Sequence, residues 1–276
     1  MVGDAQTRTG PAIYALCNDM DRDVWGPLEH SGEVAVSWRV GRCRLWARPA
    51  GDEWEIAVRH SQTDQEPSGT VAEGELDWTR FVTKADARLK IVPALPDRPV
   101  VVRPATPIVI LPGRGGRFFF RVPLWVRFVS APGGRETTMA EIPTRRLASI
   151  WFGDLATGEL CYAIEAHLQR NLEQLVIDRS FAACEVIVRN ESRERLRFER
   201  ICVHVEHMRL FEVGDRLWTN EVRVAFRGAE QISQLTFLPH PPAIAADSVA
   251  ISGPRVAPET NLIKRSFAFI RQITGI

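Results

Sequence analysis

The sequence has no long apolar run and no recognisable targeting segment. No stretch approaches the roughly 18 to 20 consecutive apolar residues that a membrane-spanning helix requires. The opening residues, MVGDAQTRTG, contain no apolar core of the kind that a secretory signal needs. The 5 cysteines are odd in number and irregularly spaced, which disfavours a framework of disulfide bonds. These absences predict a cytoplasmic chain with reduced thiols and no transmembrane segment.

The sequence also lacks the short motifs of the commonest enzymes and cofactor sites. It contains no GxSxG elbow, no HExxH or CxxC pair and no EF-hand loop. The glycine-rich stretch LPGRGGRF has neither the ending of a P-loop nor the spacing of a dinucleotide site. The net charge of +1 provides no overall field that would attract nucleic acid. We therefore expect no cofactor and no nucleic-acid partner, although these absences do not exclude an enzyme of an unfamiliar kind.

The dominant pattern that is present is the alternation of apolar and polar residues. Residues 34–40, VAVSWRV, and residues 53–60, EWEIAVRH, place apolar side chains at every second position. Alternation over residues 117–128 predicts that these side chains face a core: Phe118, Phe120, Val122, Leu124, Val126 and Phe128. A period of two is typical of strands, and amphipathic crossover helices are missing between them. The sequence therefore predicts an all-β fold of antiparallel, sandwich-like sheets.

Prolines and turn residues predict a division of the chain into four segments. These are a lead-in (1–24), an N-terminal β meander (25–97), the main β-sandwich (98–240), and a Pro-rich connection with a C-terminal helix (241–276). The main boundary falls at PALPDRP, residues 93–99, and the alternative is that the whole chain forms one β unit.

The end of the chain, TNLIKRSFAFIRQITGI, is the exception to the β pattern. At about 100° per residue, Ile263, Phe267 and Ile270 fall on one side of a helix. This spacing predicts a short amphipathic helix over residues 260–276 that begins at a capping residue. We expect its apolar side to contact a partner or the chain's own sheet.

The alternation changes phase within LRFERICVHVEH. Leu196 and Phe198 are apolar at even positions, whereas Ile201 and Val203 are apolar at odd positions. One extra residue near Arg200 would restore the alternation, which predicts a β-bulge.

Two predicted strands carry the residue types of a metal or thiol site. Along residues 160–168, Cys161, Glu165 and His167 share one face, opposite Leu160 and Tyr162. On ICVHVEH the corresponding face carries Cys202, His204 and Glu206. If the strands are adjacent, four side chains are available to bind zinc or to activate a thiolate: Cys161, His167, Cys202 and His204. The favoured interpretation is that this face is exposed to solvent and binds no metal.

A second candidate is the outer face of the strand at residues 117–127. It alternates arginine and aromatic side chains: Arg117, Phe119, Arg121, Trp125 and Arg127. Such a face can bind a protein partner, or it can be covered by a second layer and paired through cation–π contacts. Trp151, Asp154 and Glu159 of the following hairpin complete the candidate binding residues.

Several blocks resemble a prokaryotic family, domain of unknown function 432. They are WFG and GELCYA at residues 151–163, PIVILPG at 107–113, VPLWVRF at 122–128 and DRLWTNEV at 215–222. The resemblance extends from about residue 25 to the 230s, and it implies a β-rich prokaryotic protein with no activity, ligand or catalytic residue to carry over. It also favours a hairpin at WFGD…GELCYA, with glycines that shape the turn.

Dense alternation without a known catalytic motif predicts a non-catalytic binding or protein-assembly module. We expect its partner to be another protein or a second copy of the chain, bound through the Arg/aromatic face or the terminal helix. The alternative is a metal- or thiol-dependent enzyme centred on Cys161, His167, Cys202 and His204.

Overall fold

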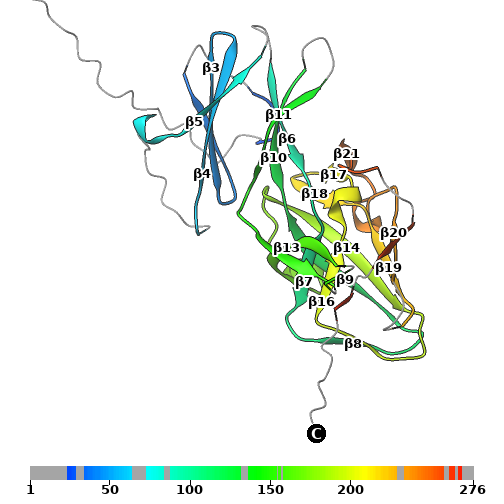
Figure 1. Cartoon of the computed structure of the whole chain (residues 1–276). Coiled ribbons are helices and arrows are strands. Elements are labelled where there is room, and N and C mark those ends of the chain that lie inside the picture. The colour runs from blue at the N-terminus through cyan, green and yellow to red at the C-terminus, as the bar shows by residue number, and fades with distance from the viewer. Residues whose placement is uncertain are drawn as a thin grey trace, which may run out of the picture. The chain divides into compact units, whose positions relative to one another are not determined.

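A computed structural model describes residues 24–28, 34–63, 73–83, 88–131, 136–153, 155–156, 158–228, 233–257, 261–264 and 267–268 (Figure 1). Their regular secondary structure consists of strands and short 3-10 turns, which confirms the all-β prediction. Within this part of the chain, no helix is long and apolar enough to cross a membrane. The described residues divide into two compact units, one within residues 1–92 and 127–141 and the other within residues 93–126 and 142–276. The four-segment division stays a prediction.

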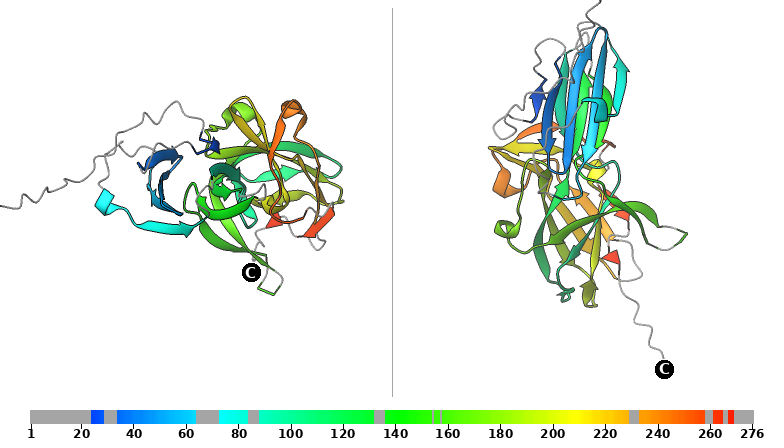
Figure 2. Two further views of the ribbon diagram at one scale, coloured as in Figure 1. Left: turned by 90° about the horizontal axis from the view of Figure 1, so that it is seen from above. Right: turned by 90° about the vertical axis from the view of Figure 1, so that its left-hand side faces the viewer.

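The first unit is built on two four-stranded sheets (Figure 2). One is an antiparallel meander of β2 (Val36–Val40), β3 (Cys43–Ala50), β4 (Glu53–His60) and β5 (Trp78–Val82). The other has the order β1-β6-β10-β11, from β1 (Gly26–Pro27), β6 (Leu89–Ala94), β10 (Trp125–Ser130) and β11 (Thr137–Pro143). Large apolar side chains fill the core of this unit, among them Leu45, Trp54, Ile56, Leu89 and Phe128.

The second unit contains a large sheet organised around β14 (Phe181–Asn190). β9 (Gly115–Pro123) pairs with β14 antiparallel, whereas β18 (Arg216–Thr219) and β19 (Val222–Phe226) pair with it in parallel. The sheet ends with β17 (Leu210–Val213) and β21 (Val249–Ser252) beyond β18, and with β20 (Ser233–Phe237) and β22 (Asn261–Lys264) beyond β19. Phe118, Phe120 and Val122 of β9 are fully buried, as the alternation predicts.

A five-stranded sheet in the same unit carries most of the reactive side chains. Its order is β12 (Ala148–Phe152), β13 (Glu159–Leu168), β7 (Val100–Pro104), β16 (Arg200–Val203) and β23 (Phe267–Ala268). β7 therefore lies between β13, to which it is parallel, and β16, to which it is antiparallel. The consecutive residues Val100, Val101 and Val102 are all buried, so both faces of this sheet are covered at its centre.

The predicted β-bulge near Arg200 is wrong. Leu196 and Phe198 lie on β15 (Leu196–Phe198), which pairs with β8 (Ile108–Ile110), whereas Ile201 and Val203 lie on β16, which pairs with β7. The phase changes because the chain leaves one sheet at Glu199 and enters another, so each half alternates against a different core.

The C-terminal helix predicted over residues 260–276 is wrong where the structure describes this segment. Ile263 lies on β22, which pairs with β20, and Phe267 lies on β23, which pairs with β16. Ile270 lies outside the described residues. Isoleucine and phenylalanine favour strands, and a sheet edge supplies backbone hydrogen-bond partners for an arriving segment. These preferences override the helical spacing.

The turn between β12 and β13 depends on Gly153. Its φ of +108° is a conformation that L side chains rarely adopt, and a Cβ there would lie 2.8 Å from Cα of Gly158. The two strands pair in register from Ala148↔Ala163 to Phe152↔Glu159. The close approach of the two glycines therefore fixes where Glu159 begins β13.

We expect Gly153→Ala to destabilise the chain by about 3 kcal/mol, because the new methyl group meets backbone atoms in a strained conformation. The matched control is Gly214→Ala, at a turn with φ +60° where a Cβ meets nothing within 4 Å. The control should cost only about 1 kcal/mol. Urea unfolding of both variants measures the difference, and equal costs would contradict the close approach of the glycines.

Candidate metal centre

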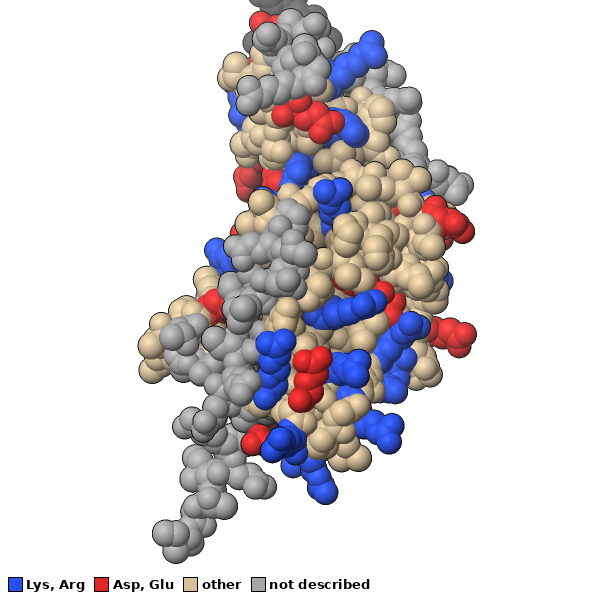
Figure 3. Space-filling view, turned by 90° about the vertical axis from the view of Figure 1, so that its right-hand side faces the viewer, with Lys and Arg blue, Asp and Glu red and all other residues tan. Residues whose placement is uncertain are grey.

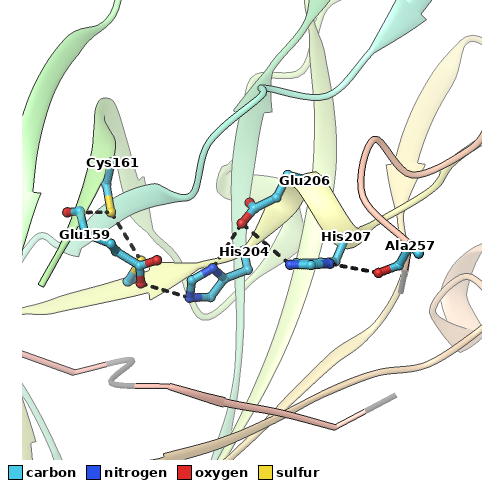
Figure 4. Close-up of polar contacts among 7 residues, drawn as sticks. Glu159, Cys161, His204, Glu206, His207 and Ala257 are labelled. Carbon is cyan, nitrogen blue, oxygen red and sulfur yellow. Dashed lines mark hydrogen bonds and ion pairs between the residues drawn. The ribbon is translucent and has the colours of Figure 1, made fainter. Parts of the chain in front are cut away.

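Three potential metal ligands converge at the start of β13 and the end of β16. Glu159 is the first residue of β13, Cys202 lies on β16, and His204 follows that strand directly. Their ligand atoms all lie within 4.8 Å of one another (Figure 4). The strands align because Tyr162 of β13 and Val203 of β16 both pair with Val100 of β7.

The imidazole of His204 lies between two carboxylates. Its Nδ1 is 3.1 Å from Oε1 of Glu206, and its Nε2 is 3.2 Å from Oε1 of Glu159. The His204 side chain is fully buried, and Nε2 makes no aligned hydrogen bond despite the short contact with Glu159. A metal ion bound between Nε2 and the Glu159 carboxylate would replace this contact.

Two thiols meet beside this cluster. Sγ of Cys161 lies 3.6 Å from Sγ of Cys202, and both residues are buried with Val101 and Phe152. The separation is much longer than the S–S bond of about 2.05 Å in a disulfide. Both cysteines are free thiols in this structure.

A second layer of residues holds the turn that follows His204. The 3-10 turn Val205–His207 brings Glu206 back toward the imidazole. Backbone N–H groups of Arg255 and Val256 donate to the main-chain oxygen of Glu206, at 3.0 and 3.1 Å. Nδ1 of His207 lies 3.3 Å from the main-chain oxygen of Ala257. The segment at residues 255–257 therefore holds the turn in place.

Burial and neighbouring charges shift two pKa values in the cluster. Burial raises the pKa of Cys202 well above its ordinary value, and the hydrogen bond with Cys161 and the charges of Glu159 and Glu206 raise it further. Burial lowers the pKa of His204, but the carboxylates of Glu159 and Glu206 outweigh it, so the net direction is upward. Without a bound cation the Cys202 thiol is therefore favoured over the thiolate, and a metal ion must displace its proton.

The structure brings together only some of the predicted metal ligands. Cys202 and His204 converge with Glu159, and the thiol of Cys161 contacts that of Cys202, whereas His167 is exposed on β13 and lies outside the cluster. The interpretation that this face is exposed to solvent is wrong at Cys161 and Cys202, which are both fully buried. Leu160, predicted to be buried, is 44 % exposed. Further along β13 the prediction agrees with the structure, since Leu168 is buried and Glu165 and His167 are exposed. The error at Leu160 and Cys161 arises because the sheet is covered on both sides near its centre.

The remaining predicted binding residues lie apart from the cluster. Phe119 and Trp125 are buried, whereas Arg117 pairs with Glu185 at 2.7 Å and Arg127 pairs with Glu141 at 2.7 Å. The guanidinium of Arg121 lies over the ring of Phe181 at 4.2 Å. On the face shown in Figure 3, basic side chains gather over the lower part of the view, with a few acidic side chains among them.

Binding by this Arg/aromatic face stays a prediction. Trp151 is 48 % exposed on β12, and Asp154 lies outside the described residues.

The spacing of residues in the sequence carries a signal for the cluster. Glu159 and Cys161 are two residues apart on one strand, and Cys202 and His204 are two residues apart on the other. Side chains at i and i+2 of a strand share a face, so each strand presents a pair of donors. His207 was not predicted, because the 3-10 turn after His204 interrupts the alternation.

Comparison with known families places the chain in one of them. A family model described as "Protein of unknown function (DUF432)" matches residues 24–271, and the chain therefore belongs to this family. No curated protein and no solved structure matches the chain.

We expect the four cysteines of the described residues to resist thiol reagents in the folded protein. Cys43, Cys161, Cys184 and Cys202 are all buried, and burial raises the pKa of Cys43 and of Cys184 to about 12. The experiment uses a Cys17→Ser variant at pH 8, with mass spectrometry after brief alkylation. Labelling should require denaturant, and rapid labelling of any of the four in the folded protein would contradict this packing.

Proposed function

We propose that this member of the DUF432 family binds a transition-metal ion through Glu159, Cys202 and His204, and that zinc is the ion. The observation that carries the proposal is the convergence of a carboxylate, a thiol and an imidazole within 4.8 Å, from strands that are far apart in the sequence. Zinc is bound in proteins by these three donor types.

The donor chemistry and spacing favour zinc over hard cations. Thiolate and imidazole ligands suit zinc, whereas calcium and magnesium require oxygen ligands. Zinc–ligand bonds of about 2.0 to 2.3 Å place tetrahedral ligand atoms roughly 3.3 to 3.8 Å apart. The 3.2 Å between Nε2 of His204 and Oε1 of Glu159 is close to that range. The pair needs little rearrangement to receive an ion.

We propose a non-catalytic role for this metal-binding protein, in a prokaryotic cytoplasm. The buried free thiols support a reducing compartment. A thiol-dependent enzyme has less support, because burial raises the pKa of Cys202 and so disfavours the nucleophilic thiolate.

We expect the full-length protein to bind about one zinc ion per chain and to lose it in Cys202→Ser and in His204→Gln. The matched control is His167→Gln, since His167 is an exposed histidine outside the cluster. Elemental analysis after zinc loading and desalting measures the content, and circular dichroism confirms that each variant is folded. Zinc-free wild-type protein, or retention of zinc by both folded site variants, would contradict the proposal.

A second candidate function is self-association through the β12–β13 hairpin. Trp151 and Leu160 are cross-strand partners, 48 % and 44 % exposed, and Leu155 in the turn is 94 % exposed. β12 is an outer strand of its sheet, and its sequence ASIWF contains no charge or proline. Edge strands that remain single usually carry such blocking residues, which favours a second copy as the partner.

We expect Trp151→Ser to shift the protein from dimer toward monomer in sedimentation velocity, because the substitution removes an apolar side chain from the proposed contact. Val249→Ser is the control, since Val249 is 69 % exposed on β21, an outer strand of the eight-stranded sheet that contains β14. A wild-type protein that sediments as a monomer at all concentrations would rule out this candidate.

A further inference from the structure

We infer that Cys161 is a fourth ligand, so that Glu159, Cys161, Cys202 and His204 enclose the ion in a complete tetrahedral shell. The inference rests on the proposed function, and it adds both a residue and a coordination state. Cys161 is two residues from Glu159 on β13 and shares its face. Each of the two strands therefore contributes a pair of donors.

The distance between the two sulfur atoms fits shared coordination. Two thiolates bound to zinc at about 2.3 Å in a tetrahedron are roughly 3.8 Å apart. Sγ of Cys161 lies 3.6 Å from Sγ of Cys202, close to that value. The Cys161 thiol now donates to the main-chain oxygen of Glu159 at 3.6 Å, and it lies outside the group of ligand atoms that are all within 4.8 Å of one another. To bind the same ion, the Cys161 side chain must turn from that oxygen toward Glu159 Oε1 and His204 Nε2.

A disulfide is a poor alternative explanation for the two cysteines. They lie on strands that flank β7, and Cys202 pairs directly with Val101 of that strand. Neighbouring strands are about 4.8 Å apart, so the two Cα atoms are separated by nearly two such spacings. Disulfides require Cα atoms within about 7 Å, so oxidation would distort the sheet.

The groups around His204 prepare it to bind an ion with Nε2. Glu206 Oε1 lies 3.1 Å from Nδ1, where it accepts a hydrogen bond in the tautomer that carries the proton on Nδ1 and leaves the Nε2 lone pair for the ion. Nε2 is the buried atom without an aligned hydrogen bond, and it lies beside the Glu159 carboxylate. Glu206 is thus a positioning residue for the imidazole, held in turn by Arg255 and Val256 through its main-chain oxygen.

Four protein ligands leave no coordination position for water or substrate. Zinc sites of this closed kind stabilise structure, whereas catalytic sites keep one position open. The ion would connect β13 to β16 across β7 and fasten the turn after His204 to both. The proposed metal therefore acts as a structural cross-link between segments that are distant in the sequence.

Cobalt(II) replaces zinc in such sites and reports thiolate ligands through a near-ultraviolet charge-transfer band, whose intensity follows the number of bound thiolates. The test compares full-length wild type with Cys161→Ser and with Cys43→Ser, a buried cysteine outside the cluster. We expect Cys161→Ser to lose about half of the band per bound cobalt, or to lose cobalt while remaining folded, whereas Cys43→Ser keeps the full band.

An unchanged band in Cys161→Ser would overturn the fourth ligand and leave the three-residue site intact. A wild-type chain that binds neither cobalt nor zinc would instead overturn the proposed function. If Cys161→Ser does not fold, X-ray absorption of the zinc-loaded wild type decides the question. Two sulfur neighbours support the inference, and one sulfur neighbour contradicts it.

Discussion

The pairing of β13 and β16 with opposite sides of β7 is the constraint on which the candidate site depends. Because Tyr162 and Val203 both pair with Val100, the potential metal ligands of β13 and β16 lie on the same face of the sheet. The same sheet is covered on both faces at β7, so the donors are buried. A change of register by one residue on either strand would turn its donors to the opposite face.

Burial makes this arrangement costly without a ligand. A buried polar atom that lacks a partner costs roughly 1 to 3 kcal/mol. Oε2 of Glu206 is buried without a hydrogen bond, and the contact of His204 Nε2 is with the Glu159 carboxylate, at 3.2 Å. A cation would bind Nε2 directly, and its binding free energy would add to the stability of the folded chain. Structural metals are retained in proteins for this reason.

The sequence predicts where the strands lie better than it predicts which strands are adjacent in the sheets. Alternation identified the buried Phe118 and Phe120 correctly, since it depends only on local geometry. The pairing of Cys161 with Cys202 joins segments separated by 41 residues, with β7 from much earlier in the chain between them. No local pattern encodes such a partner, so the candidate ligands were named but the wrong histidine, His167, was grouped with them.

Errors of face and element had similar causes. The sequence predicts an exposed Cys161 because, where both faces of a sheet are buried, alternation does not show which face is polar. The sequence predicts a helix at Ile263 because its apolar spacing fits a helix, but the strand β20 provides backbone hydrogen-bond partners that favour a strand. The family blocks WFG and GELC now have a structural interpretation. Gly153 shapes the turn after which Glu159 and Cys161 lie on β13, on the face of the sheet that also carries Cys202 of β16.

Anomalous diffraction at the zinc absorption edge, from crystals of zinc-loaded protein, tests the central claim most directly. We expect one strong anomalous peak, within bonding distance of the Cys202 sulfur and of Nε2 of His204. A folded chain with no peak there, and with protein or solvent atoms in the space among these side chains, would contradict a metal site at this position.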